Sequence, residues 1–399
     1  MKENVTKEIN DNFEKITDWL TNKKKNLPQV FYSSVDIRES LFKYASIDTN
    51  IFPAGFNNLD QSNFESLKNE CDQFIKLNFP NCKTILLLCE DHTRNTFYIE
   101  NVYHLVKIIE NNGYNVIVAS FLNEHPTICK ETGFLSLTSA NNHSIDVHCL
   151  DYIRNNRSQF DIDICILNND LSDGKYHELL DLNIPIYPHP NFGWHNRKKS
   201  THFETLNKLT TRMINECKLN IDSWHLTTLF TTIENININN EDDRHKIADE
   251  ATKLLNKIKE KYSEYNINEA PYLVLKSNNG TYGMGVISIE NPSDILTLNR
   301  KKRNKLSTGK SSIPIQNLMI QEGIPSINTI NQKIAEEVIY NVNGTTISGF
   351  YRSHEKKSSK DILNTTGMEF KSFQTELSKQ SYVLAQLANL SAQEELTNL

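Results

Sequence analysis

The sequence predicts an α/β protein, with a parallel, doubly wound sheet in its middle part and an α+β arrangement in its C-terminal part. Between residues 83 and 190, apolar runs of strand length alternate with polar loops and amphipathic helices, a succession typical of parallel sheets. After residue 270, strand-like runs follow one another and a single helix closes the chain. We therefore expect more than one domain.

Length and charge narrow the class of protein. At 399 residues the chain is too long for one ordinary core, so two or three domains are expected. The net charge is −6 and no basic face covers a whole domain, which argues against nucleic acid as a partner. No run approaches the ~18 apolar residues that span a bilayer, and the N-terminus lacks the apolar core of a signal peptide. The expected location is the cytoplasm, away from the membrane, and the sequence does not predict the oligomeric state.

The cysteines predict no disulfide framework and no zinc site. Seven of them are scattered along the chain without a CxxC pair, and several lie in apolar runs where a buried thiol is the simplest interpretation. We expect them to be reduced.

Residues 1–80 predict an N-terminal helix and a pair of strands. Val5, Ile9, Phe13, Ile16 and Leu20 follow helical spacing. Residues 29–60 contain two short strand-like runs, each with an aspartate, followed by a turn. A second amphipathic helix carries Phe64, Leu67, Cys71 and Phe74.

Residues 81–220 form the α/β part. Its predicted strands are 83–90, 114–121, 161–170 and 184–190, and Gly113 closes the helix between the first two. The segments that follow three of these strands, "EDHTRN", "NNDLSDG" and "PHPNFGWHNRKKS", are unusually polar. Because doubly wound sheets bind ligands at the carboxyl ends of their strands, these segments are a candidate binding face; ordinary solvated loops are the alternative.

The α/β part ends with a predicted helix at 201–218. In residues 221–399, the first predicted helix is 241–264. A basic segment at 299–310 is expected to be a solvated, mobile connection, and strands are expected at 315–324, 333–342 and 345–352. Asn343-Gly344 predicts a hairpin between the last two. A closing helix is expected at about 376–390.

One segment, "YLVLKSNNGTYGMGVISI" at 272–289, carries a chemical signal. Lys276 follows directly after an apolar run, and Gly280, Gly283 and Gly285 come next, before a second apolar run begins. Glycines let backbone N–H groups approach an anion closely, and a lysine adds a point charge for the same phosphates. The order differs from that of a P-loop, since the lysine precedes the glycines. Taken alone, a glycine-containing hairpin is an equally good interpretation.

The segments that follow strengthen the signal. "MIQEGI" ends a strand in Gln321-Glu322, and the last strand of the hairpin ends in Arg352, where an arginine can neutralise a transferring phosphoryl group. This succession resembles the ATP-grasp superfamily. More closely, the chain resembles the glutamate–cysteine ligases of the proteobacterial type, through "SSVDIRESLFKYASIDTNIFPAGFNNL", "EDHTRNTFYIENV", "LNNDLSDG", "GWHNRKKSTHF", "LKSNNGTYGMGVI", "IQEGI", "GFYRSH" and "LNTTGMEF".

The resemblance implies ATP-dependent ligation of the γ-carboxyl of L-glutamate to the amino group of L-cysteine through an acyl phosphate, with ADP as product and ATP and Mg²⁺ as cofactors. It implies that residues 81–220 are a Rossmann-like pre-ATP-grasp substrate domain and residues 221–399 the ATP-grasp nucleotide-binding domain. Residues 1–80 would contribute a helix and a strand pair to the ATP-grasp core.

The implied catalytic residues are Lys276 and Arg352. The implied nucleotide contacts are Lys276, Ser277, Asn279, Gly280, Thr281, Tyr282, Gly283, Gly285, Gln321, Glu322 and Glu337. Since neighbours on a strand face opposite sides, only one of Glu336 and Glu337 can point at the nucleotide; Glu337 is the one assigned.

The expected acidic pair for magnesium is missing after Arg352, and the N-terminal strands supply a candidate instead. Asp36 lies on one strand, and Asp48 and Asn50 lie two residues apart on the next, so that both of the latter leave the same face. We therefore expect a circularly permuted domain in which these three residues bind the metal. The alternative is that the aspartates cap strands or pair with Arg38.

Candidate ligands for the substrate carboxylates are Arg38, Arg94, Asn95, Arg197 and Asn364. No general base is assigned. Two other functions stay open: an ATP-grasp ligase that uses a different amine, and a non-catalytic nucleotide-binding regulator. A nicotinamide enzyme is disfavoured, because the first α/β strand is not followed by GxGxxG.

Overall fold

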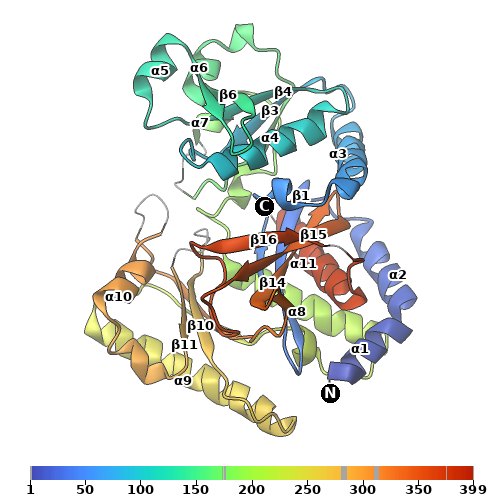
Figure 1. Cartoon of the computed structure of the whole chain (residues 1–399), viewed down its shortest axis with the longest axis vertical. Helices are drawn as coiled ribbons and strands as arrows, with labels where there is room; N and C mark the ends of the chain where they lie inside the picture. Colours follow the sequence, from blue (N-terminus) through green and yellow to red (C-terminus); the bar gives the residue numbers. More distant parts are fainter. Residues whose placement is uncertain are drawn as a thin grey trace.

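Figure 1 shows the computed structural model of the chain, in which a smaller α/β body stands above a larger body built from two further sheets. The structure describes residues 2–172, 174, 177–279, 285–309, 314–373 and 375–398. The strands are β1 (Tyr32–Glu39), β2 (Tyr44–Asn50), β3 (Thr84–Cys89), β4 (Asn115–Ser120), β5 (Phe134–Thr138), β6 (Ser144–Cys149), β7 (Ile164–Asn168), β8 (Ile186–Tyr187), β9 (Phe230–Ile233), β10 (Leu273–Ser277), β11 (Val286–Ile289), β12 (Leu318–Glu322), β13 (Thr329–Ile330), β14 (Lys333–Val342), β15 (Thr345–His354) and β16 (Met368–Ser372). The helices are α1 (Lys2–Asp11), α2 (Phe13–Lys24), α3 (Phe64–Asn78), α4 (Thr96–Glu110), α5 (Pro126–Glu131), α6 (Leu150–Asn155), α7 (His177–Leu180), α8 (Lys199–Glu216), α9 (Glu241–Glu264), α10 (Arg300–Ser307) and α11 (Lys379–Thr397).

The upper body contains the predicted parallel sheet. Its strand order is β5-β6-β4-β3-β7-β8, and all pairs are parallel except the edge strand β5, which runs antiparallel to β6. Strand β3 is buried along its whole length, as expected for a strand covered on both faces. The α/β prediction for this part is confirmed. The β5–β6 hairpin was not predicted, because both strands are short, are only partly buried and lack a clear apolar run.

The central sheet of the lower body joins both ends of the chain. Its order is β16-β15-β14-β1-β2, with β13 also paired to β14. The N-terminal hairpin lies antiparallel to β14, with Asp36 opposite Val338 on β14 and opposite Asp48 on β2. This pairing is the one expected of a permuted domain. The turn Asn343-Gly344 joins β14 to β15 with both residues at positive φ, which is the conformation that favours Asn-Gly.

Helices cover one face of this central sheet. α1, α2, α8 and α11 share an apolar core with the residues of β1 and β14 that point to their side. α11 packs against α8, α2, α1 and the four strands β1, β2, β14 and β15, and most of its residues are buried. The other face packs partly against α3 and the upper body, and the rest of it lines a cavity.

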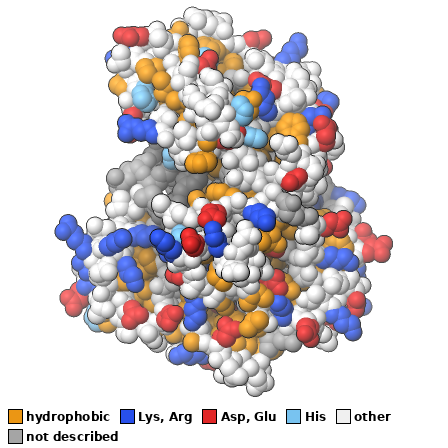
Figure 2. Space-filling view, viewed as in Figure 1, with side chains coloured by type: hydrophobic (Ala, Val, Ile, Leu, Met, Phe, Trp, Pro, Cys, Tyr) orange, Lys and Arg blue, Asp and Glu red, His pale blue; other side chains and the backbone are white. Residues whose placement is uncertain are grey.

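The third sheet, β11-β10-β12-β9, is antiparallel and packs against α9. In Figure 1 these elements form the lower left part, together with α10. The expectation of an irregular loop at 299–310 is wrong for most of this segment. Arg300–Ser307 is a helix, which begins where Asn299 accepts a hydrogen bond from the backbone N–H of Lys302. Figure 2 shows Lys and Arg side chains gathered on this flank.

One expectation about the cysteines is also wrong. Cys129 and Cys149 form a disulfide between α5 and the end of β6, whereas Cys71, Cys82, Cys89, Cys165 and Cys217 are free thiols. The two partners are 20 residues apart and share no sequence motif, so only the fold brings them together. Within the part of the chain that the structure describes, no helix is long and apolar enough to cross a membrane.

Candidate active site

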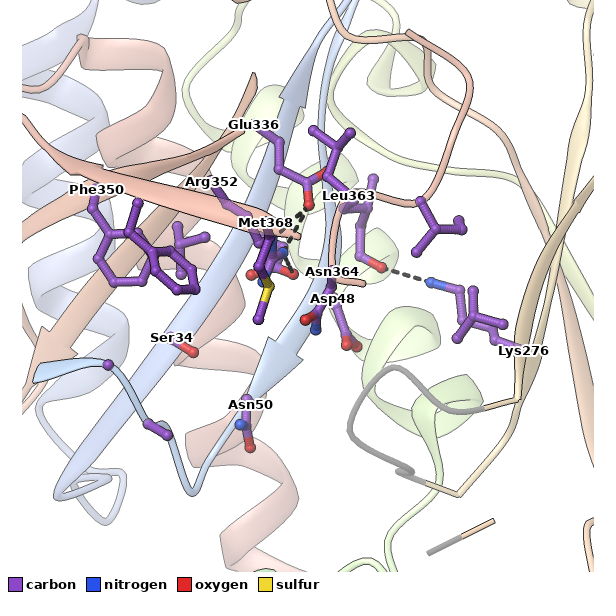
Figure 3. Close-up of a pocket in the computed structure, with 18 of the residues that line it drawn as sticks. Ser34, Asp48, Asn50, Lys276, Glu336, Phe350, Arg352, Leu363, Asn364 and Met368 are labelled. Carbon is purple, nitrogen blue, oxygen red and sulfur yellow. Dashed lines mark hydrogen bonds and ion pairs between the residues drawn. The ribbon is translucent and has the colours of Figure 1, made fainter. Parts of the chain in front are cut away.

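A cavity of about 760 Å³ lies where the three sheets approach one another. The face of the central sheet opposite α11, strands β10 and β12 and the start of α4 all contribute to its walls. Lys276 and Arg352 line this same cavity. Figure 3 shows Lys276 approaching from one side, and Arg352, Met368 and Phe350 lying on the other. The volume is in the range of pockets that hold cofactors and substrates.

Strand alternation explains which side chains reach the cavity. Ser34, Asp36 and Arg38 leave β1 on one face, and all three line the cavity. Asp48 and Asn50 do the same from β2, and Figure 3 shows them near Ser34. The predicted geometry of the N-terminal strand pair, with its polar side chains on one shared face, is therefore present.

Glu336 is the centre of a buried charge network. Its carboxylate accepts hydrogen bonds from Arg38 Nε at 2.6 Å and from Arg352 Nε and Nη2 at 2.9 and 2.8 Å. Arg352 also pairs with Asp36. Although burial alone would raise it, Arg38 and Arg352 hold the pKa of Glu336 below its ordinary value. Burial raises the pKa of Asp36 to about 6, against the opposite effect of Arg352.

The assignment of Glu337 to the nucleotide is wrong in this geometry. Its carboxylate accepts a hydrogen bond from Ser381 of α11, on the helix-covered face of the sheet. Its neighbour Glu336 lines the cavity instead. Because side chains alternate along a strand, only one of the two glutamates can face the cavity. The sequence alone did not identify which of them does.

A second set of charges surrounds Asp48. Lys199, at the start of α8, forms an ion pair with Asp48, and Lys276 Nζ donates to the backbone carbonyl of Ile47 at 2.8 Å. Burial lowers the pKa of Lys276 to about 8, and Asp48 partly offsets this. Although burial alone would raise it, Lys199 and Lys276 hold the pKa of Asp48 well below its ordinary value. Two lysines and one carboxylate thus leave a local excess of positive charge, which suits an anion.

The strand end "MIQEGI" lies at the side of the cavity formed by the third sheet. Ser277, Gln321 and Glu322 line the cavity. Gln321 Nε2 donates to Thr228 Oγ1 at 2.7 Å. The Glu322 carboxylate accepts hydrogen bonds from Lys43 Nζ at 3.1 Å, from Trp224 Nε1 and from the backbone N–H of Leu229. These contacts give the carboxylate a structural role.

Three predicted arginine ligands have other partners. Arg38 uses its guanidinium on Glu336 and on the backbone carbonyls of Ile324 and Asp361. Arg197 is buried, does not line the cavity, and pairs with Glu395 at 2.7 Å. Arg94 is largely exposed, pairs with Glu124 and does not line the cavity. Arg94 and Arg197 therefore lie away from the cavity, which contradicts their assignment to substrate carboxylates. Arg38 does line the cavity, and its assignment stays a prediction.

The remaining predicted residues differ in their positions relative to the cavity. Asn95 and Asn364 line the cavity, and the Asn95 side chain also caps α4 by accepting from Tyr98 N–H. Asn279 does not line the cavity but donates to the carbonyls of Trp194 and Arg197. Gly285, at the start of the next described segment, has a φ of 67°. Gly280, Thr281, Tyr282 and Gly283 lie outside the described residues.

The acidic residues at the centre fit a magnesium ion that also takes phosphate ligands. Asp36 and Asp48 face each other across β1 and β2, and Asn50 adds an amide oxygen on the same face. Such hard oxygens suit Mg²⁺, which protein sites usually hold with one or two carboxylates and substrate phosphates. Among the described residues, no three or more His, Cys, Asp or Glu side chains cluster as metal ligands, so phosphate oxygens would have to complete the shell.

Several cavity residues escaped the sequence analysis. The residues that line the cavity but were not assigned to the site from the sequence include Ser34, Lys199, Glu336, Asn101, Trp194, Phe350, Met368 and Phe370. Period-two spacing from Asp36 could have identified Ser34, and the same spacing from Arg352 could have identified Phe350. Lys199 and Asn101 carry no such signal, because they reach the cavity from helices whose positions depend on tertiary packing.

Comparison with known proteins decides between the functions that the geometry allows. The glutamate-cysteine ligase family, GshA, matches residues 6–395. The chain belongs to this family. It is also similar to the "Putative gamma-glutamylcysteine synthetase" of Methylobacillus flagellatus KT, with 29% identity and a TM-score of 0.86, over 99% of this chain and 96% of that chain.

Two further solved structures are much less similar. D-alanyl-alanine synthetase A from Vibrio cholerae shares 13% identity at a TM-score of 0.35, over 77% of this chain and 80% of that one. D-cycloserine synthetase DcsG shares 11% identity at a TM-score of 0.40, over 79% and 82%. Neither match supports an argument. No curated protein matches the chain by sequence.

Family membership confirms the main expectations. The chain has the fold class and the ATP-dependent carboxylate–amine ligase activity that the resemblance implied, as a glutamate–cysteine ligase of glutathione biosynthesis. Its substrates are accordingly small molecules and ATP.

Proposed function

We propose that this cavity joins the γ-carboxyl of L-glutamate to the amino group of L-cysteine through γ-glutamyl phosphate. An oxygen of the γ-carboxylate attacks the γ-phosphorus of ATP, and ADP leaves. The cysteine amine then attacks the carbonyl carbon, phosphate leaves, and the nitrogen loses a proton. The observation that carries this proposal is the convergence of Lys276, Arg352, Asp36 and Asp48 on one cavity.

The protein contributes mainly position and charge. Phosphoryl transfer through a loose transition state needs little covalent chemistry from the enzyme. In the proposed arrangement, Lys276 and Lys199 meet the charge of the phosphates, while Arg352 neutralises charge that develops on the transferring group. Arg38 acts through Glu336, because their hydrogen bond holds the carboxylate that orients Arg352.

Asp36, Asp48 and Asn50 are the residues that would hold Mg²⁺. When bound, the metal would supply positive charge that stabilises the phosphates of ATP. Asp36 and Asp48 each lie against a cation in this structure, Arg352 and Lys199. These ion pairs hold both carboxylates in place and favour their ionised forms, against the effect of burial.

We also propose a cytoplasmic location, because reducing compartments maintain the free thiol of the substrate cysteine. The free thiols of Cys71, Cys82, Cys89, Cys165 and Cys217 agree with this location, whereas the Cys129–Cys149 disulfide is an exception to it. The reaction requires no nucleic acid or membrane partner.

A direct assay tests the proposed chemistry. Purified protein is incubated with ATP, Mg²⁺, L-glutamate and L-cysteine, and nucleotide and dipeptide products are measured. We expect ADP, phosphate and a γ-linked dipeptide, each dependent on both amino acids. Formation of AMP and pyrophosphate would contradict the acyl-phosphate route, and full activity with cysteine replaced by unrelated amines would favour a ligase of different specificity.

A further inference from the structure

Strand β2, which carries the proposed metal ligand Asp48, lies at the edge of the central sheet. Among the described residues, β1 is the only strand paired with it, so the carbonyls on its outer edge need partners from outside the sheet. Two side chains supply them. Lys276 Nζ donates to the carbonyl of Ile47 at 2.8 Å, and Arg197 Nη1 donates to the carbonyl of Thr49 at 3.3 Å. The backbone on both sides of Asp48 is therefore held from outside the sheet.

Thr49 stands between the two proposed metal ligands of β2, Asp48 and Asn50, and its side chain leaves the strand on the other face. Both ligands line the cavity (Figure 3), whereas Thr49 is 2% exposed and is not part of the cavity wall. Its Oγ1 lies 2.9 Å from Nε2 of His202, on α8. Because peptide groups are planar, a contact that fixes Thr49 also limits the directions in which its two neighbours can point.

His202 is held in turn by the last helix of the chain. Its Nδ1 contacts Oε1 of Glu395 on α11, 193 residues further along the sequence. Arg197 Nε pairs with the other oxygen of the same carboxylate at 2.7 Å, and His202, Arg197 and Glu395 are all buried. A connected set of buried polar groups therefore runs from α11 through α8 to Thr49.

The contacts of the imidazole assign its hydrogen bonds. Although burial alone would raise it, Arg197 and His202 hold the pKa of Glu395 well below its ordinary value, so the carboxylate is ionised and can only accept. Nδ1 of His202 faces this carboxylate more closely than it faces Arg197 Nη2, at 3.1 Å, and therefore carries the proton. Burial lowers the pKa of His202, although Glu395 opposes this. In the neutral ring Nε2 is an acceptor, and the Thr49 hydroxyl donates to it.

The beginning of α8 is also joined to the end of β10. The backbone N–H of Lys199 donates to the carbonyl of Asn278 at 2.7 Å, and that of Ser200 donates to Asn278 Oδ1 at 2.9 Å. Asn278 Nδ2 donates to Ser200 Oγ at 3.0 Å. Ser277, the residue before Asn278, lines the cavity. The same part of α8 thus contacts the strand of the proposed metal ligands and the strand that carries Lys276.

Resting on the proposed function, in which Asp48 and Asn50 hold a divalent ion, we propose that His202 is a positioning residue for that ion. It holds Thr49 and so fixes the orientation of both ligands, while Glu395 fixes the imidazole. Mg²⁺ requires nearly ideal octahedral geometry, so a small rotation of a ligand weakens its binding. The loss of a contact that orients a ligand typically lowers metal affinity by roughly 10–100-fold.

The removal of one hydroxyl tests this role without a change to any proposed ligand. Thr49→Val keeps the shape of the side chain and abolishes its hydrogen bond to His202, whereas Thr49→Ser keeps the hydroxyl. Thr49 is changed rather than His202, because the loss of the imidazole would also leave the buried Glu395 carboxylate with fewer partners.

Calorimetry gives a readout that does not depend on turnover. Binding of a non-hydrolysable ATP analogue is measured with and without Mg²⁺, and the ratio of the two affinities reports the contribution of the ion. We expect Thr49→Val to lower this ratio about tenfold while the affinity without Mg²⁺ stays within twofold, and Thr49→Ser to keep the ratio within threefold. An unchanged ratio in Thr49→Val would overturn this proposal alone. A ratio of one in the unmodified protein would overturn the proposed metal site, and this proposal with it.

Thr210→Val provides the matched control for the loss of a buried hydroxyl. Thr210 is also buried on α8, and its Oγ1 donates to the carbonyl of Leu206 at 2.8 Å, within the helix. We expect the two valine variants to lose similar stability in urea unfolding, and only Thr49→Val to change the response to Mg²⁺.

Steady-state kinetics completes the comparison. In Thr49→Val, the Mg²⁺ concentration for half-maximal activity should rise about tenfold, excess Mg²⁺ should restore most of the rate, and the KM values for both amino acids should stay within twofold. Equal changes of the Mg²⁺ response in Thr49→Val and Thr210→Val would show that loss of stability is the cause and would refute the proposal. A loss in Thr49→Ser as large as that in Thr49→Val would also refute it.

Discussion

At the scale of single residues, the cavity contains charges that are almost all paired before any ligand binds. Arg352 pairs with Asp36 and Glu336, and Lys199 with Asp48. Lys276 differs, because its described hydrogen bond is to a neutral carbonyl, that of Ile47. It is therefore the cation that gains most when a triphosphate enters, since no carboxylate bond has to be broken first.

Replacing Lys276 tests this difference. Lys276→Met keeps the length of the side chain and removes its charge, and we expect kcat/KM for ATP to fall by about 10²–10³-fold. Lys198→Met is the control, since Lys198 pairs with the exposed Glu234 and does not line the cavity. Steady-state kinetics at saturating amino acids measures both. Wild-type kinetics in Lys276→Met would place the triphosphate elsewhere.

Long-range partners explain why the sequence did not reveal the ion pairs of two arginines. Arg38 is 298 residues from Glu336 and Arg197 is 198 residues from Glu395, so nothing near either arginine in the sequence shows that its charge is neutralised. Lys276 and Arg352 were easier to predict, because each stands at the cavity end of an apolar strand.

At the scale of elements, β14 separates two environments. Glu336 faces the cavity, and Glu337 faces α11, where it accepts a hydrogen bond from Ser381. Burial raises the pKa of Glu337 from 4.5 to about 7, although Ser381 partly opposes this. The carboxyl is therefore neutral in the folded protein over a range of pH in which it is ionised in the unfolded chain.

This difference predicts how stability depends on pH. Between about pH 4.5 and 7 the folded state binds more protons than the unfolded state at Glu337, so the free energy of unfolding decreases as the pH rises through this window. Glu337→Gln removes the titration and should flatten the dependence by about 1–3 kcal/mol. Urea unfolding at pH 5 and pH 8 measures it. An equally steep dependence in the variant would show that other groups cause it.

Elements with a strong local sequence pattern were predicted correctly, whereas elements that depend on tertiary pairing were missed. The turn Asn343-Gly344 and the apolar runs of β3 and β14 are strong local signals, and each was found. The strand β16 was missed, because three of its five residues are exposed and its place depends on pairing with β15. Likewise, the helix Arg300–Ser307, capped by Asn299, was missed because the basic composition of 299–310 suggested a solvated connection.

At the scale of the whole molecule, the reacting centre is assembled from both ends of the chain. β1 and β2 bring Asp36, Asp48 and Asn50 to the edge of β14, and α11 packs behind the same sheet. The upper body contributes the start of α4 to the cavity. Figure 2 shows hydrophobic side chains where the upper and lower bodies meet. The sequence suggested that the N-terminal strands complete the nucleotide-binding part, but it could not show that Lys199 and Asn101 complete the cavity.

The central claim is that a triphosphate and a divalent ion meet the carboxylates of β1 and β2 in this cavity. The measurement that tests it most directly is the Mg²⁺ dependence of ADP formation, with glutamate and cysteine present, in the unmodified protein and in Asp48→Asn. We expect Asp48→Asn to lower the maximal rate by about 10²-fold or more and to require higher Mg²⁺ for half-maximal activity. A variant with the same rate and the same Mg²⁺ dependence as the unmodified protein would contradict the account.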